Sequence, residues 1–210
     1  MEIPLADTMP ALFSTFPRGF VNRQGCTVLA VRPHATFSVA DAYQYITGPA
    51  AIEATEGLRA LVASRAVPDA PTRQEQDAEQ DYKKLHFEVA TFGGTFTYRS
   101  ARSLVADSGL RAIDIDDLAG EDEARALQRL LIADHHFSTA LCFLSPRGCG
   151  VKWVVALPDD WRSIGTRQQY MGLVKYLLFE YGIVADRSGS DISRACYLPH
   201  DAQCYLGPQF

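Results

Sequence analysis

The sequence predicts an α+β protein in which helices pack against a β-sheet. From residue 83 on, short segments rich in β-branched and aromatic residues alternate with two long helical segments, in the order β-β-β-α-β-β-α-β. The 210 residues are 47% hydrophobic and 21% charged, which is typical of a globular protein and excludes a mainly disordered one. This length is sufficient for a substantial hydrophobic core.

The chain divides into three parts. Residues 1–68 form a smaller N-terminal α/β block, with a strand at Cys26–Arg32 and two helices between Val39 and Ser64 that are broken at Gly48-Pro49. The stretch 67–82 has two prolines and almost no large apolar side chains. This indicates that residues 69–82 are a surface linker, either a loop or a frayed helix start, and not part of the core. We expect the block to pack on residues 83–210, so that the whole chain forms one structural domain.

The larger part begins with two segments of alternating side-chain character, residues 86–92 and 95–100, which are predicted to be strands. Gly93-Gly94 between them indicates a tight turn or bulge. An apolar strand at 111–117 and a helix at 121–136 come next. Two strands then flank the turn Pro-Arg-Gly-Cys-Gly, and the helix 166–182 ends at a glycine. The remaining residues are expected to form short strands and turns.

Charge and cysteine content narrow the functional classes. With 20 Lys and Arg against 25 Asp and Glu, the chain has no global positive field, so contact with nucleic acid would need a local patch. No apolar run is long enough to span a membrane, and the N-terminus does not resemble a secretory signal. Five cysteines without a C-x-x-C pair argue against a structural zinc site or a disulfide framework and favour a cytoplasmic protein.

Asp114 and Asp116 are the first candidate functional residues. Side chains at positions i and i+2 of a strand point to the same face, and two carboxylates there are costly to bury without a partner. Mg²⁺ or Mn²⁺ would relieve that cost, because hard cations prefer carboxylate oxygens. The alternative is that both carboxylates lie at a frayed strand end and face water.

Two further segments contain candidate residues. The turn from Ser145 to Lys152 has two glycines that allow close approach of an anion, followed by a lysine that could contact a phosphate. An ordinary glycine hairpin is the alternative. Asp186 follows an apolar pair, and this third carboxylate could join Asp114 and Asp116 around metal ions. Asp191 and Arg194 lie one helical turn apart and could pair with each other. The alternative is a capped turn with a surface salt bridge.

These motifs, in this order, resemble the archaeo-eukaryotic primase superfamily. Within it, the chain is most similar to the primase-polymerase-like N-terminal domain of Bacteroides-type mobile elements and phages, a VirE N-terminal-like family. The similarity covers residues 82–206 and rests on five segments: Tyr82-Lys83-Lys84-Leu85, Thr91–Phe96, Ser108-Gly109-Leu110 before Asp114-Ile115-Asp116, Ser145–Lys152, and Asp191-Ile192-Ser193-Arg194.

The resemblance implies a primase-type palm, an RRM-like sheet with helices packed on it, and two divalent ions, Mg²⁺ or Mn²⁺, held by Asp114, Asp116 and Asp186. It implies nucleotide binding by the residues that match the phosphate motif and the last motif: Ser145, Gly148, Gly150, Lys152 and Arg194. The chain departs from the superfamily at Lys152, where a histidine is usual; lysine can hold a phosphate but cannot exchange protons near neutral pH.

The expected function is that of a metal-dependent nucleotidyltransferase, a DNA primase-polymerase that acts in mobile-element or phage replication. Its partners would be nucleoside triphosphates, a single-stranded DNA template, and a helicase or primase C-terminal domain, fused or separate. Candidate nucleic-acid contacts are Lys83, Lys84, Arg99 and Arg111, although these could form a solvated sheet edge. The alternatives are a non-catalytic nucleic-acid-binding module and a metal-dependent nuclease.

Overall fold

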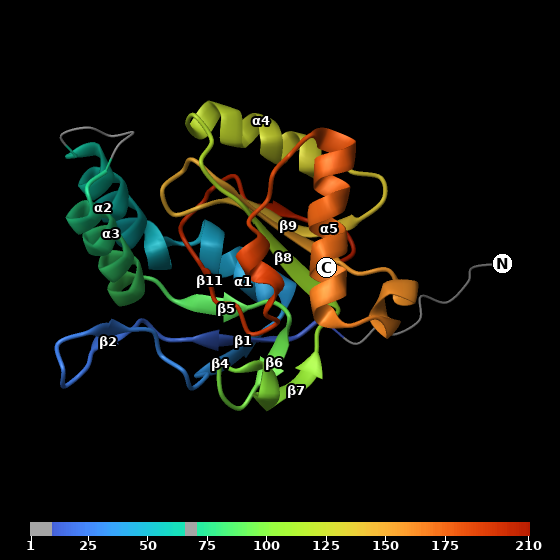
Figure 1. Cartoon of the computed structure of the whole chain (residues 1–210), viewed down its shortest axis with the longest axis horizontal. Helices are drawn as coiled ribbons and strands as arrows, with labels where there is room; N and C mark the ends of the chain where they lie inside the picture. The colour runs from blue at the N-terminus through green and yellow to red at the C-terminus, as the bar shows by residue number, and fades with distance from the viewer. Residues whose placement is uncertain (1–9, 66–70) are drawn as a thin grey trace.

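The computed structural model describes residues 10–65 and 71–210, and within them the fold is mixed α/β. Two four-stranded sheets, both antiparallel, are packed against each other. Helices α4 (Glu121–Ile132) and α5 (Thr166–Tyr181) cover the outer face of the sheet that contains Asp114 (Figure 1). In these residues no helix combines the length and apolar character needed to cross a bilayer.

The first sheet, called the main sheet, contains the candidate aspartates. Its strands are β8 (Leu110–Ile115), β9 (Ser138–Leu144), β10 (Val151–Ala156) and β12 (Tyr205–Leu206), in the order β12-β9-β10-β8. Helix α4 (Glu121–Ile132) connects β8 to β9, and β10 lies between these two strands, so the three strands form a split β-α-β unit.

The main sheet differs from an RRM-like sheet at its last strand. In an RRM-like order, the strand after the second helix would pair with β8. Here β12 pairs with β9 at the opposite edge, and the chain after helix α5 (Thr166–Tyr181) makes a backbone hydrogen bond of 3.0 Å from Asp186 N to Asp114 O. The expected sheet is therefore only partly formed, but Asp186 still lies beside β8.

The second sheet combines strands from both ends of the chain. Its order is β11 (Cys196–Tyr197), β5 (Val89–Thr91), β1 (Phe13–Phe16) and β4 (Ala35–Phe37). Because β1 lies between β4 and β5, residues before 68 and residues after 83 share one sheet.

The predicted strand at Cys26–Arg32 is wrong for most of its length. Only Thr27–Val28 (β3) is extended, paired with Phe20–Val21 (β2). A turn at Phe92-Gly93 separates β5 from β6 (Gly94–Phe96), as the two glycines predict. The two strands pair with other partners: β5 pairs with β1 and β6 with β7 (Leu104–Asp107).

The predicted helices are confirmed. Gly48 and Pro49 separate α1 (Val39–Thr47) from α2 (Ile52–Ala63), and α5 ends at Gly182 with φ of 68°. Short 3-10 helices join the other elements at Pro49–Ala51, Ala101–Ser103, Asp159–Ser163 and Arg187–Ser190.

The segment expected to be a surface loop or a frayed helix start is mostly a regular helix, α3 (Arg73–His86). Thr72 and Glu75 form a capping box in which the Thr72 side chain accepts from Glu75 N and the Glu75 carboxylate accepts from Thr72 N. The capping signal T-x-x-E was present in the sequence, but the low apolar content obscured it. Helix α3 packs beside α2 (Figure 1), and its Glu79 is buried.

Two hydrophobic cores cover the two faces of the main sheet. One lies under α4 and α5 and includes Ile113, Ile115 and Trp153; the other lies between the two sheets and α1 and includes Leu110 and Val154. Because side chains alternate along β8, Asp114 points away from α4 and α5, toward the side of the second sheet.

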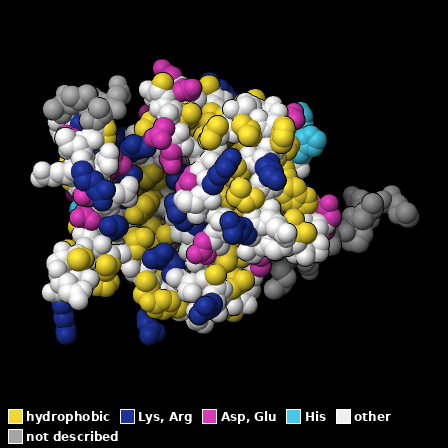
Figure 2. Space-filling view, viewed as in Figure 1, with side chains coloured by type: hydrophobic (Ala, Val, Ile, Leu, Met, Phe, Trp, Pro, Cys, Tyr) yellow, Lys and Arg dark blue, Asp and Glu magenta, His cyan; other side chains and the backbone are white. Residues whose placement is uncertain are grey.

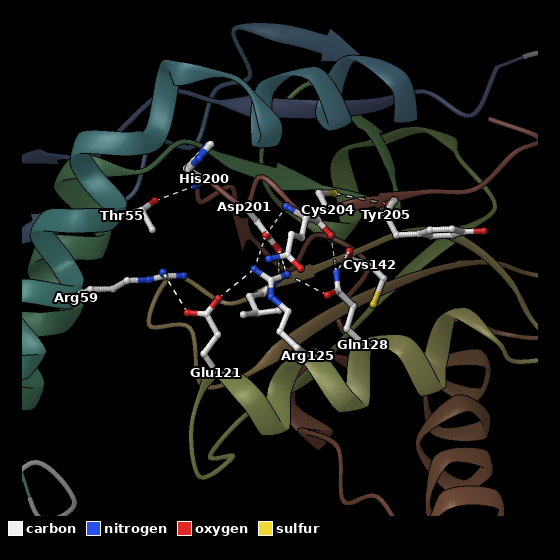
Figure 3. A network of polar contacts seen from close by, with 12 residues as sticks. Thr55, Arg59, Glu121, Arg125, Gln128, Cys142, His200, Asp201, Cys204 and Tyr205 are labelled. Atoms are coloured by element: carbon white, nitrogen blue, oxygen red, sulfur yellow. Dashed lines mark hydrogen bonds and ion pairs between the residues drawn. The ribbon is translucent and has the colours of Figure 1, made fainter.

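A buried carboxylate holds the C-terminal segment in place. Asp201, whose side chain is 0% exposed, accepts hydrogen bonds from Arg125 Nη2 at 2.7 Å and from Leu144 N at 2.8 Å. Next to it, His200 N donates to Thr55 Oγ1 in α2 (Figure 3). This network connects α2, α4 and β9, which are distant in sequence.

We expect Asp201→Asn to lower the free energy of unfolding by about 3–5 kcal/mol, because it leaves the Arg125 charge without its buried partner. Chemical denaturation followed by circular dichroism measures this loss. Asp159→Asn is the control, since the Asp159–Arg162 pair lies at the surface and should matter little. Equal effects of the two substitutions would contradict this assignment.

A second carboxylate, Asp134, fixes the end of α5. It accepts hydrogen bonds from Tyr176 Oη at 2.5 Å and Tyr181 Oη at 2.6 Å, and from two backbone N–H groups. Burial raises the pKa of Asp134, but the two tyrosines and the backbone donors outweigh it, and the net pKa is lowered.

Because the pKa of Asp134 is lowered in the folded state, the ionised carboxylate stabilises the fold at neutral pH. That stabilisation is lost as the pH falls through the folded-state pKa. We therefore expect Asp134→Asn to destabilise the protein at neutral pH and to make the fall of stability in acid less steep. Denaturation series between neutral and acidic pH measure both effects. If the free energies of unfolding of the wild-type protein and Asp134→Asn differ by the same amount at every pH, Asp134 does not contribute to the pH dependence and the prediction is wrong.

Candidate functional site

A charged cleft of about 940 Å³ lies between the α2–α3 pair and the end of the main sheet. Figure 2 shows this face, with a hollow beside the α2–α3 pair and Lys, Arg, Asp and Glu side chains along it. Lining residues from the main sheet and its β9–β10 turn include Asp114, Asp116, Ser145, Arg147 and Lys152.

The register of β8 and β10 places Lys152 directly opposite Asp114. Lys152 Nζ lies 2.5 Å from Asp114 Oδ1, as a close ion pair whose angles do not satisfy those of a hydrogen bond. Burial lowers the pKa of Lys152, but Asp114 and, at longer range, Asp116 outweigh it, so the net pKa is raised and the ammonium stays charged. Asp116, just beyond β8, is exposed.

The turn between β9 and β10 closes on itself. Ser145 N donates to Gly150 O at 2.7 Å, and Gly148 N donates to Ser145 O at 2.8 Å, so these two N–H groups are already used. Gly148 has φ of 84° and lies beneath the Arg59 guanidinium. The sequence predicts that the turn binds an anion through its backbone N–H groups, but these two N–H groups are not available for that role.

Gly150 creates the space between the turn and Asp116. A Cβ at position 150 would lie 2.8 Å from Ile115 O, 2.9 Å from Asp116 Oδ1 and 3.1 Å from Ser145 Oγ. The Asp116 carboxylate and the Ser145 hydroxyl therefore approach the same point. Ser145 Oγ is buried and has no hydrogen-bond partner among the described residues.

Asp186 is close to Asp114 through the backbone, but its carboxylate is engaged elsewhere. It accepts from Ser188 N at 2.8 Å and Ser188 Oγ at 2.6 Å, and Arg194 Nη2 lies 3.4 Å away. Burial raises the pKa of Asp186, but these hydrogen bonds and Arg194 outweigh it and lower the pKa. Asp191 accepts from Ser193 rather than pairing with Arg194.

The residues proposed to contact nucleic acid are separated in the structure. Lys83 lines the cleft, whereas Lys84 pairs with Asp81 at 3.2 Å and does not. Arg99 lines a neighbouring hollow of about 720 Å³. Arg111 is buried, where it binds Asp107 and Gln169, so it is not available to a partner.

The sequence analysis missed three residues of the cleft. Glu79 contacts Arg65 and Lys83, and its Oε1 lies 3.7 Å from Arg147 Nε. The i, i+4 spacing of Glu79 and Lys83 was a usable signal, but it required recognising α3 as a helix. Arg65 and Arg147 lie far from Glu79 in sequence and carried no signal.

The oxygen atoms around Asp116 are of the kind that hard divalent cations prefer. Asp116 itself makes no hydrogen bond or ion pair within residues 10–65 and 71–210, and it faces the unpartnered Ser145 hydroxyl. In the same residues, no group of three or more Asp, Glu, His or Cys side chains is arranged to hold a metal ion. Asp114 and Asp116, with the Ser145 hydroxyl, are therefore the donors available here.

Comparison with known proteins identifies the family of this chain. The family model described as BT4734-like, N-terminal domain matches residues 80–206, more than half of the chain. The chain belongs to the BT4734-like N-terminal domain family. The matched segment contains Asp114, Asp116, Arg147, Lys152, Asp186 and Arg194, whereas Arg65 and Glu79 precede it. No curated protein and no solved structure matches this BT4734-like chain.

We expect the two candidate aspartates to differ in their effect on stability. Asp114→Asn leaves Lys152, whose side chain is only 9% exposed, without its anion and should cost about 3 kcal/mol. Asp116→Asn removes an exposed carboxylate without a partner in the fold and should be close to neutral. Urea denaturation of both variants measures the difference, and a larger loss for Asp116→Asn would contradict it.

Proposed function

We propose that this protein is a metal-dependent nucleotidyltransferase of the DNA primase-polymerase type, acting in the cytoplasm in mobile-element or phage replication. The observation that supports this most is the position of Asp114, Asp116 and Lys152 together at the floor of a charged cleft. The split β-α-β unit that presents them is compatible with a primase-type palm.

In this proposal Asp114 and Asp116 would hold Mg²⁺ or Mn²⁺ together with phosphate oxygens of a nucleoside triphosphate. Bound divalent ions would neutralise charge on the phosphates and stabilise the developing negative charge during transfer. Asp186 could contribute to a two-ion site only after its carboxylate leaves Ser188 and Arg194. Such a change would be driven by the ions themselves.

Lys152 would act by charge. Its raised pKa keeps the ammonium protonated, so it suits electrostatic binding of a phosphate and not proton transfer. When a cation binds Asp114, the ammonium would lose part of its attraction to that carboxylate and could turn to the phosphate chain. Ser145, with its unpartnered hydroxyl, would donate a hydrogen bond to the same ligand.

The neighbouring hollow offers a path for a single-stranded template. It shares Arg194 and Tyr197 with the cleft and adds Arg99 and Arg102. Arginine side chains can contact a phosphate backbone, and a tyrosine can stack on a base. The template would enter here, with a helicase or primase C-terminal domain as a further partner.

A non-catalytic nucleic-acid-binding module is the second candidate. It is favoured by the engaged state of Asp186 and by the ion pair that already neutralises Asp114. A metal-dependent nuclease would use the same carboxylates and differ in its product.

Extension of a labelled oligonucleotide, with and without a primer, in Mg²⁺ and in Mn²⁺, tests the proposal. We expect incorporation by the wild-type protein and a loss of at least about 100-fold for Asp116→Asn, since the ligand carboxylate is removed while the fold is kept. Lys84→Met, outside the cleft, is the control. Shortened products would indicate a nuclease. Incorporation by Asp116→Asn at the wild-type rate would defeat the assignment.

A further inference from the structure

Three cations surround one buried carboxylate in the cleft that Asp114 and Asp116 also line. Glu79, in α3, pairs with Arg65 from the end of α2, with Lys83 one turn later, and with Arg147 from the β9–β10 turn. Arg147 also reaches Asp117, at 3.3 Å, beyond β8. We call Arg65, Lys83 and Arg147 the cation cluster.

The cation cluster is built into the fold and is not a set of mobile surface lysines. The exposed fractions of the side chains are 5% for Arg65, 6% for Glu79, 12% for Lys83 and 24% for Arg147, yet all four line the cleft. Their guanidinium and ammonium groups therefore line the cleft while most of each side chain is buried in the fold.

Positive charge exceeds negative charge in this space. Arg65, Lys83 and Arg147 carry three positive charges against the two negative charges of Glu79 and Asp117. Burial lowers the pKa of Lys83, with help from the charges of Arg147 and Lys152. The same cations outweigh the effect of burial on Glu79 and lower its pKa. Buried cations in excess of their counterions are costly, and a multiply charged anion would relieve that cost.

Phosphate chains match this arrangement in charge and geometry. Arginine binds phosphate oxygens with its planar fork, and lysine adds a point charge. The cleft volume of about 940 Å³ is within the range of sites that hold small ligands, about 300–1,000 Å³. A ligand with its phosphates at the cation cluster would extend toward Asp116 and Lys152, which line the same cleft.

We propose that Arg65, Lys83 and Arg147, held in place by Glu79, form a binding site for the polyphosphate chain of a small ligand. Its identification as a nucleoside triphosphate rests on the proposed function, but the polyphosphate site itself does not. The segment that follows α2 then contributes to the site directly through Arg65, which lies outside the family-matched segment.

Isothermal titration of the whole protein with inorganic tripolyphosphate, in EDTA and at low salt, tests this site without any metal ion. We expect the wild-type protein to bind and Lys83→Met and Arg147→Gln each to bind about tenfold more weakly or less, because each loses a charge-assisted contact. Lys84→Met is the matched control, since Lys84 is the next residue of α3 and lies outside the cleft; its affinity should be unchanged.

Thermal melts of each variant, with and without tripolyphosphate, separate lost binding from lost folding. A folded variant with no ligand-induced rise in melting temperature supports the site. Equal affinities for Lys83→Met and Lys84→Met, or no binding by the wild-type protein, would overturn it, whatever the outcome of the primer-extension assay.

A second titration, with an oligothymidylate that lacks terminal phosphates, distinguishes a polyphosphate from the backbone of a nucleic acid. If Lys83→Met weakens only the binding of the oligonucleotide, the phosphates at the cluster belong to a strand and the polyphosphate assignment is wrong. If it weakens tripolyphosphate binding and leaves the oligonucleotide unaffected, the assignment holds, even for a protein that fails to incorporate nucleotides.

Discussion

The pairing register of β8 and β10 is the constraint on which the candidate site depends. It places Asp114 opposite Lys152 and sends both side chains away from α4 and α5, while Ile113 and Trp153 point into the core beneath these helices. A slip of one residue would exchange the two sets, burying the charges under the helices. The hydrophobic core therefore selects the register, and the register determines which residues reach the cleft.

The ion pair between Asp114 and Lys152 has two opposing consequences. It neutralises a lysine that would otherwise be a nearly buried, uncompensated charge, so it stabilises the empty protein. It also occupies the carboxylate that a divalent cation would need. Under the proposed function, binding of a cation and an anion together would avoid this conflict, because Asp114 would gain the cation while Lys152 would gain the phosphate. The proposal therefore predicts that a charged ligand that brings its own cation binds better than a free metal ion.

The N-terminal elements are part of the fold and of the cleft. Strand β1 pairs with β4 on one side and with β5 on the other, and helices α2 and α3 form one wall of the cleft. Asp201 connects α4 with β9, and its neighbour His200 bonds to α2, so the position of this wall depends on a buried polar network as well as on apolar packing. The family match begins at residue 80, within α3, and the wall is thus shared between matched and unmatched parts of the chain.

The sequence by itself determined most helices, the β8, β9 and β10 strands and the position of Asp114 within β8, because these depend on local periodicity and on caps such as Gly182. The sequence predicts Asp116 in the same strand, but this residue lies just beyond its end and is exposed. It failed for α3, whose polar composition concealed the capping box at Thr72, and for Cys26–Arg32, where pairing partners limited the extended region.

Only the tertiary structure decided which charges meet. Arg65, Glu79 and Arg147 gather from three separate segments, Arg111 is buried against Asp107, and the Asp186 carboxylate caps its own turn beside Asp114. Ion pairs between distant residues depend on how helices and sheets pack, and that arrangement carries no periodic signal along the chain.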